Sequence, residues 1–452
     1  MLIPIAKKEI IEHVHSFRFL IAFLFILITF CIMMLTRHFD YKAKYDDYLL
    51  RTKAQEESAY KYANYNRIGA LAMPIVPPAP MEIIAEPVVS VSGISYTDSD
   101  SSLEDDPLSN SRINLDMIAL IGLLGSLLAL LLSYDSVNRE VREGTLRLLL
   151  SSAVPRTKVI SGKILGGGIA ALLPIATVFL LASMYLAITG GLGWGLNQWL
   201  SLLIIFMVSI IYVVLFYCLG TFLSSVILDQ TLSVFSCFAV WILFVLVIPT
   251  ISPYIAKAAI KIPDAAVVQR EINYIMNVER EEAIRNAMRP FLDQGMSREE
   301  AWDKAELSKL NIQYYEKVSA METDLRTASI RQARLAIQLS CLSPYSMYLL
   351  SVQELSGMGI DRITHLINLI SNWGQKAQEY IEHKFNEAKR LNPSFSFEDK
   401  LDVSDGPHFK YEDPALSNKV SSAIPYILLL IGYFLLPLFF FLFTFNSRRT
   451  LL

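Results

Sequence analysis

Residues 133–166 read SYDSVNREVREGTLRLLLSSAVPRTKVISGKILG and join two long apolar segments. Residues 137–143 alternate acidic and basic side chains, which the hydrocarbon of a bilayer does not accommodate, whereas the flanking segments carry almost no charge. This pattern is typical of a short helix that lies outside a membrane between two spanning helices. The stretch therefore predicts the fold class, an all-α integral membrane protein.

The composition of the whole chain agrees with that prediction. Of its 452 residues, 53% are apolar and 18% are charged, whereas soluble domains have roughly 45–50% and 25%. The net charge of −3 gives no indication of nucleic-acid binding. The four cysteines form neither a disulfide framework nor a metal-binding pattern, because three of them lie in apolar runs.

Six apolar runs are long enough to cross about 30 Å of hydrocarbon. We place the transmembrane helices at 17–36, 114–134, 161–189, 198–228, 232–256 and 420–446. The first is an uncleaved anchor rather than a signal peptide, because Arg37-His38 closes it and no cleavage site follows. Gly162 and Gly166 form a small-xxx-small step, which predicts close helix packing. Kinks or breaks are expected at Pro174, Pro249, Pro253, Pro425 and Pro437.

Lys and Arg in the short connections predict the orientation. They cluster before the first span, between spans two and three, and after the last, so these three places are expected to be cytoplasmic. The expected cytoplasmic parts are an interfacial helix at 1–16, a coupling-helix region at 135–160, a short turn at 229–231 and a tail at 447–452. The expected extracytoplasmic parts are 37–113, a short loop at 190–197, and 257–419. An even number of spans agrees with this assignment.

The two long outer segments differ in character. Residues 37–113 begin with a tyrosine-rich helix, pass through the proline-rich stretch 73–87, and end in the acidic run 98–106. Residues 257–419 predict a helical domain in which Gly295 ends one helix and Ser297–Glu300 is a capping box for the next. A further element is expected to begin at Ser343-Pro344 and to end at Gly357 and Gly359. The helical domain at 257–419 has three apolar stripes. They are Ile272, Ile275, Met276, Ile284, Met288, Phe291 and Leu292; Leu307, Leu310, Tyr314, Val318, Met321 and Leu325; and Ile363, Leu366, Ile370, Trp373, Ala377, Tyr380 and Ala388.

Catalytic motifs are absent from the sequence. It contains no HExxH and no GxSxG, and His365 and His383 are isolated on helical segments. Ser161-Gly162-Lys163 lacks the upstream glycine and the strand of a phosphate-binding loop, so ATP binding is not expected in this chain. Candidate ion-relay acids fall at span ends rather than at bilayer depth. Uphill transport would therefore draw its energy from another polypeptide.

Residues 133–166 resemble the signature of ABC-type exporter permeases of the type-2 (ABC-2) family. In that family a segment of the form (Y)D-x4-E-x3-G-T-L-x2-L-L-x2-P-x2-R, followed by G-K, connects the second and third spans. The matching residues are Tyr134, Asp135, Glu140, Gly144, Thr145, Leu146, Leu149, Leu150, Pro155, Arg156, Gly162 and Lys163. MPIVPPAPMEII and SCLSPYSMYLLSVQELSGMG further resemble a branch with a large extracytoplasmic insertion between the last two spans.

The resemblance implies a coupling helix that inserts into a groove of a separate ABC ATPase subunit. That ATPase would bind ATP and Mg, and two ATPases would work with two permease chains, as a homodimer or with a sister permease. A bacterial cytoplasmic (inner) membrane is implied. The coupling residues would be Asp135, Val137, Arg139, Glu140, Arg142, Glu143, Gly144, Thr145, Leu146 and Arg147. From spacing alone, docking and a solvated loop that sets topology remain equally open.

Three functions follow from these observations. The first is a permease subunit of an ATP-driven exporter with an unidentified substrate. The second is an ABC-type mechanical transducer, in which the outer helices act on an extracytoplasmic partner without translocation. The third is a motor-free membrane scaffold, and the presence or absence of a co-purifying ATPase distinguishes it from the other two.

Overall fold

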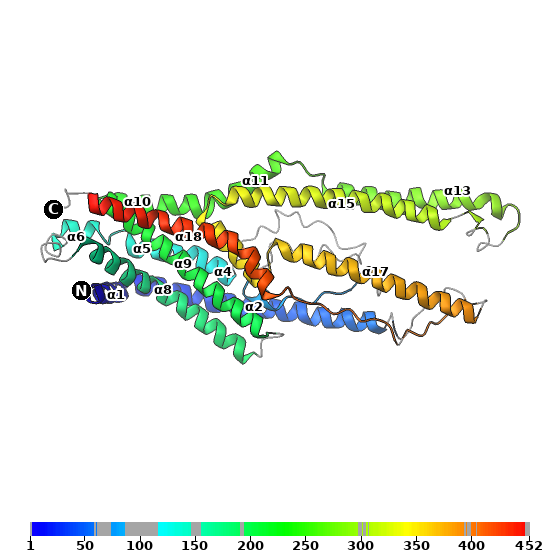
Figure 1. Cartoon of the computed structure of the whole chain (residues 1–452), viewed down its shortest axis with the longest axis horizontal. Coiled ribbons are helices and arrows are strands. Elements are labelled where there is room, and N and C mark those ends of the chain that lie inside the picture. The colour runs from blue at the N-terminus through cyan, green and yellow to red at the C-terminus, as the bar shows by residue number, and fades with distance from the viewer. Residues whose placement is uncertain are drawn as a thin grey trace. The chain divides into compact units, whose positions relative to one another are not determined.

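A computed structural model describes most of the chain (Figure 1). The described residues are 2–57, 60, 74–85, 116–145, 155–189, 194–296, 301, 304–305, 307–392, 395, 399–403 and 405–447. Throughout these ranges the regular secondary structure is helical. Contacts group the described residues into two compact units. Unit 1 comprises those of Met1–Asp98, Ile113–Leu246 and Ser343–Leu452, and unit 2 comprises those of Val247–Leu342.

Six helices among the described residues are long and apolar enough to cross a membrane. They are Phe17–Glu56, Met117–Arg142, Thr157–Ile188, Leu196–Val226, Gln230–Ala259 and Leu416–Phe443. The predicted all-α fold with six spans is confirmed. Some helix ends differ from the expected boundaries, because α2 (Phe17–Glu56) runs twenty residues past the expected end at 36 and α8 (Arg156–Ile188) begins five before 161. The helices also continue through Pro174, Pro253, Pro425 and Pro437 without a break.

The helix α9 (Leu196–Val226) lies at the centre of unit 1 and packs against α8, α18 (Leu416–Ser447) and the second span. The second span consists of α4 (Met117–Leu120), the π-helical turn η5 (Ile121–Gly125) and α5 (Ser126–Ser133). The Tyr212 hydroxyl of α9 donates to the carbonyl oxygen of Gly122 at 2.7 Å. A π turn leaves helix carbonyls available to other partners, and here a neighbouring span supplies the donor.

A short helix that is not one of the spans is buried among them. The helix α16 (Pro344–Ser356) packs against α9 and α18, and its tyrosines Tyr345 and Tyr348 are buried. The rings of Tyr348 and Tyr212 stack with centroids 4.4 Å apart, and the Tyr348 hydroxyl lies 3.1 Å from Ser209 Oγ. The predicted ends of this element are confirmed, since Ser343 caps it and Gly357 follows it with φ +74°. Its partners differ from the prediction, which placed it in a single domain at 257–419.

The helix α17 (Ile360–Leu391) also belongs to unit 1. It lies at the end of that unit opposite α1 (Leu2–Val14) and α6 (Asn138–Arg142) (Figure 1). The described residues that cover its apolar stripe include those of the chain that returns toward α18. Ile381 packs with Leu401 and Val403, and the rings of Trp373 and Phe409 meet at 5.6 Å. The Tyr380 hydroxyl and the Lys384 ammonium group both bind the Asp405 carboxylate, at 2.8 and 2.9 Å. We call residues 399–413 the return segment.

Unit 2 is built around an antiparallel helical hairpin. One arm consists of α12 (Ala265–Tyr274), the π-helical turn η7 (Ile275–Glu279) and α13 (Arg280–Leu292), and the other is α15 (Leu307–Ser340). Two clusters of predicted stripe residues form the contact, and Leu292, which is 42% exposed, is an exception to the predicted stripe. Beyond the hairpin, α15 packs against α11 (Ile248–Ala259), and Gln332 Nε2 donates to the Ile260 carbonyl at 2.7 Å.

Several predictions fall outside the described residues. They are the capping box Ser297–Glu300, the acidic run 98–106, and the positively charged end at 448–449. In the proline-rich stretch, residues 74–79 form no regular helix and Pro80–Ile83 form one 3-10 turn, as the prolines predict.

Candidate functional site

The connection between the second and third spans is held tightly to the bundle where it leaves α5. We call residues 134–145 the elbow: it consists of a turn over 134–137, the helix α6, and Gly144-Thr145. The hydroxyl oxygen of Ser224, at the end of α9, accepts from the amides of Val137 and Asn138 at 3.1 and 3.2 Å. Ser224 thus satisfies the first free amides of α6, which has no capping side chain of its own.

A buried cluster of charges joins the elbow to two other helices. Lys163 Nζ of α8 lies 2.8 Å from Glu9 Oε1 of α1, 2.9 Å from Glu140 Oε2 of α6, and 3.0 Å from the Ser136 carbonyl oxygen. The side chains of Lys163, Glu9 and Glu140 are 4–6% exposed. An ammonium group has three donors, and three oxygens surround this one. We call Glu9, Lys163 and Glu140 the charge cluster.

Further ion pairs surround the charge cluster on its more exposed side. Lys8 Nζ lies 3.2 Å from Glu140 Oε1, so Glu140 has two cationic partners. Arg18 NH1 donates to Asp135 Oδ2 at 3.0 Å, and Arg139 pairs with Glu12. Every charged residue of the elbow from Asp135 to Glu140 is therefore engaged with α1 or with the residues that follow it.

The helix α1 lies against α8 at the two glycines of the predicted close-packing step. A Cβ atom on Gly162 would come 2.7 Å from Ile5 Cγ2, and one on Gly166 would come 2.7 Å from Glu9 Cβ. Distances under 3.0 Å are too short for a real Cβ contact, so glycine is needed at both positions. The surface that packs against them belongs to the amino-terminal helix α1, which was expected to lie along the membrane surface.

His13 extends this contact toward α9. Its Nε2 lies 3.4 Å from the Tyr217 hydroxyl and 3.7 Å from Glu9 Oε2, and the two rings meet edge to face. Burial lowers the pKa of His13 below its usual value of 6.5, although the charge of Glu9 opposes the shift. The neutral imidazole is therefore favoured at this contact.

The predicted coupling residues divide into a buried group and an exposed group, with Arg139 half-buried between them. Asp135, Val137 and Glu140 are buried, and Val137 belongs to an apolar cluster with Val159, Ile160 and Phe441. Four consecutive residues, Arg142, Glu143, Gly144 and Thr145, are exposed. Leu146 and Arg147 lie outside the described residues. We call residues 142–145 the exposed tip of the elbow.

Six partners of the elbow described above were not predicted to act with it. They are Lys8, Glu9, Glu12, Arg18, Ser224 and Lys163, of which Lys163 was predicted only as part of the signature. Glu9 is separated from Lys163 by 154 positions, so no local periodicity brings the two together. The spacing of Glu9, Glu12 and His13 on one side of α1 was the available signal, because such a polar side on an apolar helix needs polar partners when it is buried.

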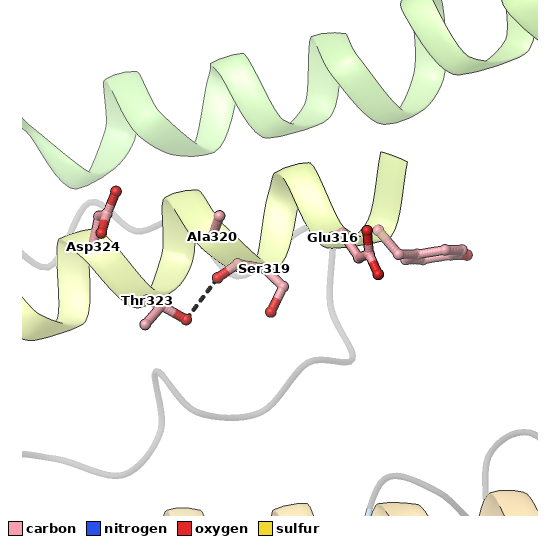
Figure 2. A pocket seen from close by; sticks show the side chains of 6 residues that line it. Glu316, Ser319, Ala320, Thr323 and Asp324 are labelled. Atoms are coloured by element: carbon pink, nitrogen blue, oxygen red, sulfur yellow. Dashed lines mark hydrogen bonds between the residues drawn. The ribbon is translucent and has the colours of Figure 1, made fainter. Parts of the chain in front are cut away.

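A second feature is a wide, open pocket on α15 in unit 2. It is lined by Tyr315, Glu316, Ser319, Ala320, Thr323 and Asp324, and the Thr323 hydroxyl donates to the Ser319 carbonyl at 2.7 Å (Figure 2). All six lining residues come from one helix, so no second element adds a converging polar group among them. Nor do His, Cys, Asp and Glu gather into a metal-binding group anywhere in the described ranges. The elbow is thus the better candidate for function.

A comparison with protein families matches residues 3–448, nearly the whole chain, to the ABC-2 family transporter proteins. This chain belongs to that family. No curated protein matches it. As an ABC-2 family member with six candidate spans, it is the multi-pass membrane subunit of an ABC transporter, a class of protein that works with an ABC ATPase. The predicted family is therefore confirmed.

Proposed function

We propose that this ABC-2 protein is the permease subunit of an ATP-driven exporter and that the exposed tip of the elbow is its contact with the ATPase. The observation that carries the proposal is the division of the elbow. Its first part is anchored by Ser224 and the charge cluster, whereas Arg142–Thr145 are exposed and carry charges of both signs. A docking surface needs exposure, and a surface that transmits force also needs a firm attachment.

The proposed working assembly contains two permease chains, as a homodimer or with a sister permease, and two ATPases. ATP and Mg would bind to the ATPase subunits. Both termini and the elbow would face the cytoplasm of a bacterium, with the six spans in its inner membrane. Nucleotide-driven closure of the ATPases would displace the exposed tip and, through α5 and α8, change access to a path for a substrate that is still to be identified.

Charge reversal at the exposed tip tests the docking step. In Arg142→Glu/Glu143→Arg, each charge stays exposed but meets the ATPase with the wrong sign. We expect the affinity for the co-purifying ATPase to fall by about tenfold, equivalent to ~1.4 kcal/mol. The measurement is the amount of ATPase retained per permease after purification in lipid nanodiscs, together with the ATP turnover of the complex.

The matched control is Glu387→Arg/Arg390→Glu, which reverses an exposed pair on α17 at the other end of unit 1. This control should retain the ATPase and its turnover. Unchanged retention and turnover in the Arg142/Glu143 variant would refute the docking role. If no ATPase co-purifies with the wild-type chain from its native membrane, the result would favour the motor-free scaffold function instead.

A mechanical transducer remains the second candidate because of the hairpin in unit 2. The 34 residues of α15 would span about 50 Å as a continuous helix, and long helices are suited to carry a displacement. The hairpin can be removed cleanly, since Gln332 and Ile260 bring its two ends together. Replacing residues 265–327 with a short Gly/Ser linker should abolish an outer mechanical effect but leave translocation intact. A deletion that includes α16 would not separate the two functions, because α16 is buried among the spans.

A further inference from the structure

The charge cluster connects three helices, of which α1 is far in sequence from the other two. Glu9 lies on α1, Glu140 on α6 and Lys163 on α8, and one ammonium group contacts both carboxylates. With Lys8 at 3.2 Å from Glu140, two positive and two negative groups meet, so their charges balance. This charge balance offsets part of the desolvation cost of burying Glu9, Glu140 and Lys163.

Such a cluster is hard to separate once it has formed. Pulling a carboxylate away from Lys163 would leave an unpaired charge in a buried contact, which is far more costly than breaking an exposed ion pair. Apolar packing of α1 on Gly162 and Gly166 holds the same helices together next to the charges. Small displacements of α6 should therefore move α1 and the start of α8 with it.

The position of the cluster relates it to the exposed tip. Glu140 lies two residues before Arg142, and its backbone carbonyl accepts from the Thr145 hydroxyl at 3.3 Å. A force applied to Arg142–Thr145 thus reaches Glu140 within one helical turn. From Glu140 it divides between α8, through Lys163, and α1, through Lys163 and Lys8.

We propose that α1 takes part in coupling ATP turnover to the permease. The coupling joint is the group of helices α1, α6 and α8, and Glu9 and Lys163 are positioning residues that make these three helices move together. The inference rests on the proposed docking at the exposed tip and extends it to an element outside the elbow. Neither Glu9 nor Lys163 would touch the ATPase. Their loss should uncouple ATP turnover from a permease that still binds its motor.

Glu9→Gln is the most informative variant. It keeps the size of the side chain and one acceptor oxygen for Lys163, leaves the Lys163–Glu140 pair intact, and removes the charge that Glu9 contributes from α1. Lys163→Met disconnects all three helices and is the stronger perturbation. The matched controls are Lys7→Gln on α1 and Lys158→Gln on α8, both at exposed positions.

Two quantities are measured on the complex with its co-purifying ATPase in lipid nanodiscs: the ATPase retained per permease, and the increase in ATP turnover caused by the permease. We expect the amount of ATPase retained by Glu9→Gln to stay within about twofold of wild type. The increase in ATP turnover caused by the permease should fall about tenfold, which is within the range found for coupling between sites. The double variant Glu9→Gln/Lys163→Met should be no worse than Lys163→Met, because both residues act in one joint.

Hydrogen exchange on the permease without its ATPase tests the joint independently. Exchange in residues 2–14 and 138–142 should rise together in Glu9→Gln, whereas residues 205–217 of α9 stay protected. This measurement keeps the inference testable if Lys163→Met does not fold or if the docking proposal fails.

Each other outcome overturns the inference. Retained ATPase with unchanged turnover in Glu9→Gln would show that α1 takes no part in coupling. Loss of ATPase in proportion to turnover would show that the cluster only shapes the docking surface. Faster exchange in α1 with no change in α6 would show that the helices are not joined. The docking proposal would survive all three results, since it is tested at Arg142 and Glu143.

Discussion

At the scale of single residues, Gly144 shows how the elbow ends. Its φ of +74° lies in the left-handed region, and a Cβ atom there would meet nothing within 4 Å. Backbone conformation, not space, therefore requires glycine, as is common after the last turn of a helix. The residue ends α6 and turns the chain at the exposed tip.

We predict that Gly144→Asn is tolerated and that Gly144→Val is not. Asn adopts the left-handed conformation readily, whereas a β-branched residue is strained there, at a cost of about 1–2 kcal/mol. The midpoint temperature of thermal unfolding in nanodiscs and the amount of ATPase retained should both be lower in the Val variant than in wild type. Equal behaviour of the two variants would show that this backbone conformation is not needed.

A second residue-scale prediction concerns pH at His13. Because burial lowers the pKa of His13, the unfolded chain takes up a proton more readily than the folded one. The stability that the neutral ring contributes is therefore complete above pH 6.5 and is lost as the pH falls through the lowered value. A difference of one pKa unit between the folded and unfolded states corresponds to a change of about tenfold in the equilibrium constant for opening of α1.

Hydrogen exchange of residues 2–14 at pH 7.5 and pH 5.5 measures this effect. The groups that face His13 are Glu9 and Tyr217, with Glu12, Asp135 and Lys163 acting over longer distances. His13→Gln should remove most of the acid sensitivity, and His15→Gln, at an exposed position, should leave it. Acid sensitivity that persists in His13→Gln would assign it to another group.

Residue-scale pairings were the part of the site that the sequence predicted least. The charges of residues 135–140 indicated that the elbow lies outside the hydrocarbon, and their alternation was compatible with a solvated surface. Their actual partners, Glu9, Glu12, Arg18 and Lys163, are set by how α1 packs on α8. Ion pairs across more than a hundred positions leave no local pattern, so the buried and exposed halves of the elbow could not be told apart.

At the scale of elements, α16 is the main departure from expectation. With 13 residues and several Ser and Tyr side chains, it is too short and too polar to be predicted as a span. The hydroxyl groups of Tyr348, Ser351 and Ser356 are hydrogen-bonded to Ser209 and to the backbone of α16 itself. The absence of charge from Cys341 to Gln353 was the signal for burial, because a solvated helix of that length normally carries charges.

Substitution of Tyr348 tests the burial of α16. We predict that Tyr348→Ala destabilises the protein by ~3–5 kcal/mol, as loss of a buried aromatic ring does. Tyr348→Phe should cost about 1 kcal/mol, because it loses the hydrogen bond with Ser209 but keeps the stacking on Tyr212. Thermal unfolding in nanodiscs, followed by tryptophan fluorescence, measures both. A negligible effect of Tyr348→Ala would contradict the packing of α16 described above.

At the scale of the whole molecule, length and hydropathy were sufficient to predict six spans, since each span is a local feature of the sequence. The division into units was not predicted, because it depends on contacts made after folding. The expected outer domain at 257–419 is split at Leu342–Ser343, with the hairpin in unit 2 and α16 and α17 in unit 1. The apolar stripe of α17 was predicted, but its cover, the return segment, has no helical periodicity of its own.

This division predicts that the hairpin is dispensable for folding of the bundle. The chain in which a linker replaces residues 265–327 should match the thermal stability of the wild-type bundle within about 0.5 kcal/mol, as expected for changes away from packed contacts. Extending the replacement to residue 356 should abolish folding, since α16 is then lost. Unfolding of the first variant would show that the units are energetically coupled.

The meeting of Gln332 with Ile260 also has a consequence for reach. Since both arms of the hairpin start from one fixed base, inserting a heptad in each arm would advance the far end by about 10 Å and preserve the apolar seam. Insertions of other lengths would rotate the two seams out of register. The length of the hairpin in this ABC-2 protein can therefore change in steps of one heptad, while every residue of unit 1 stays the same.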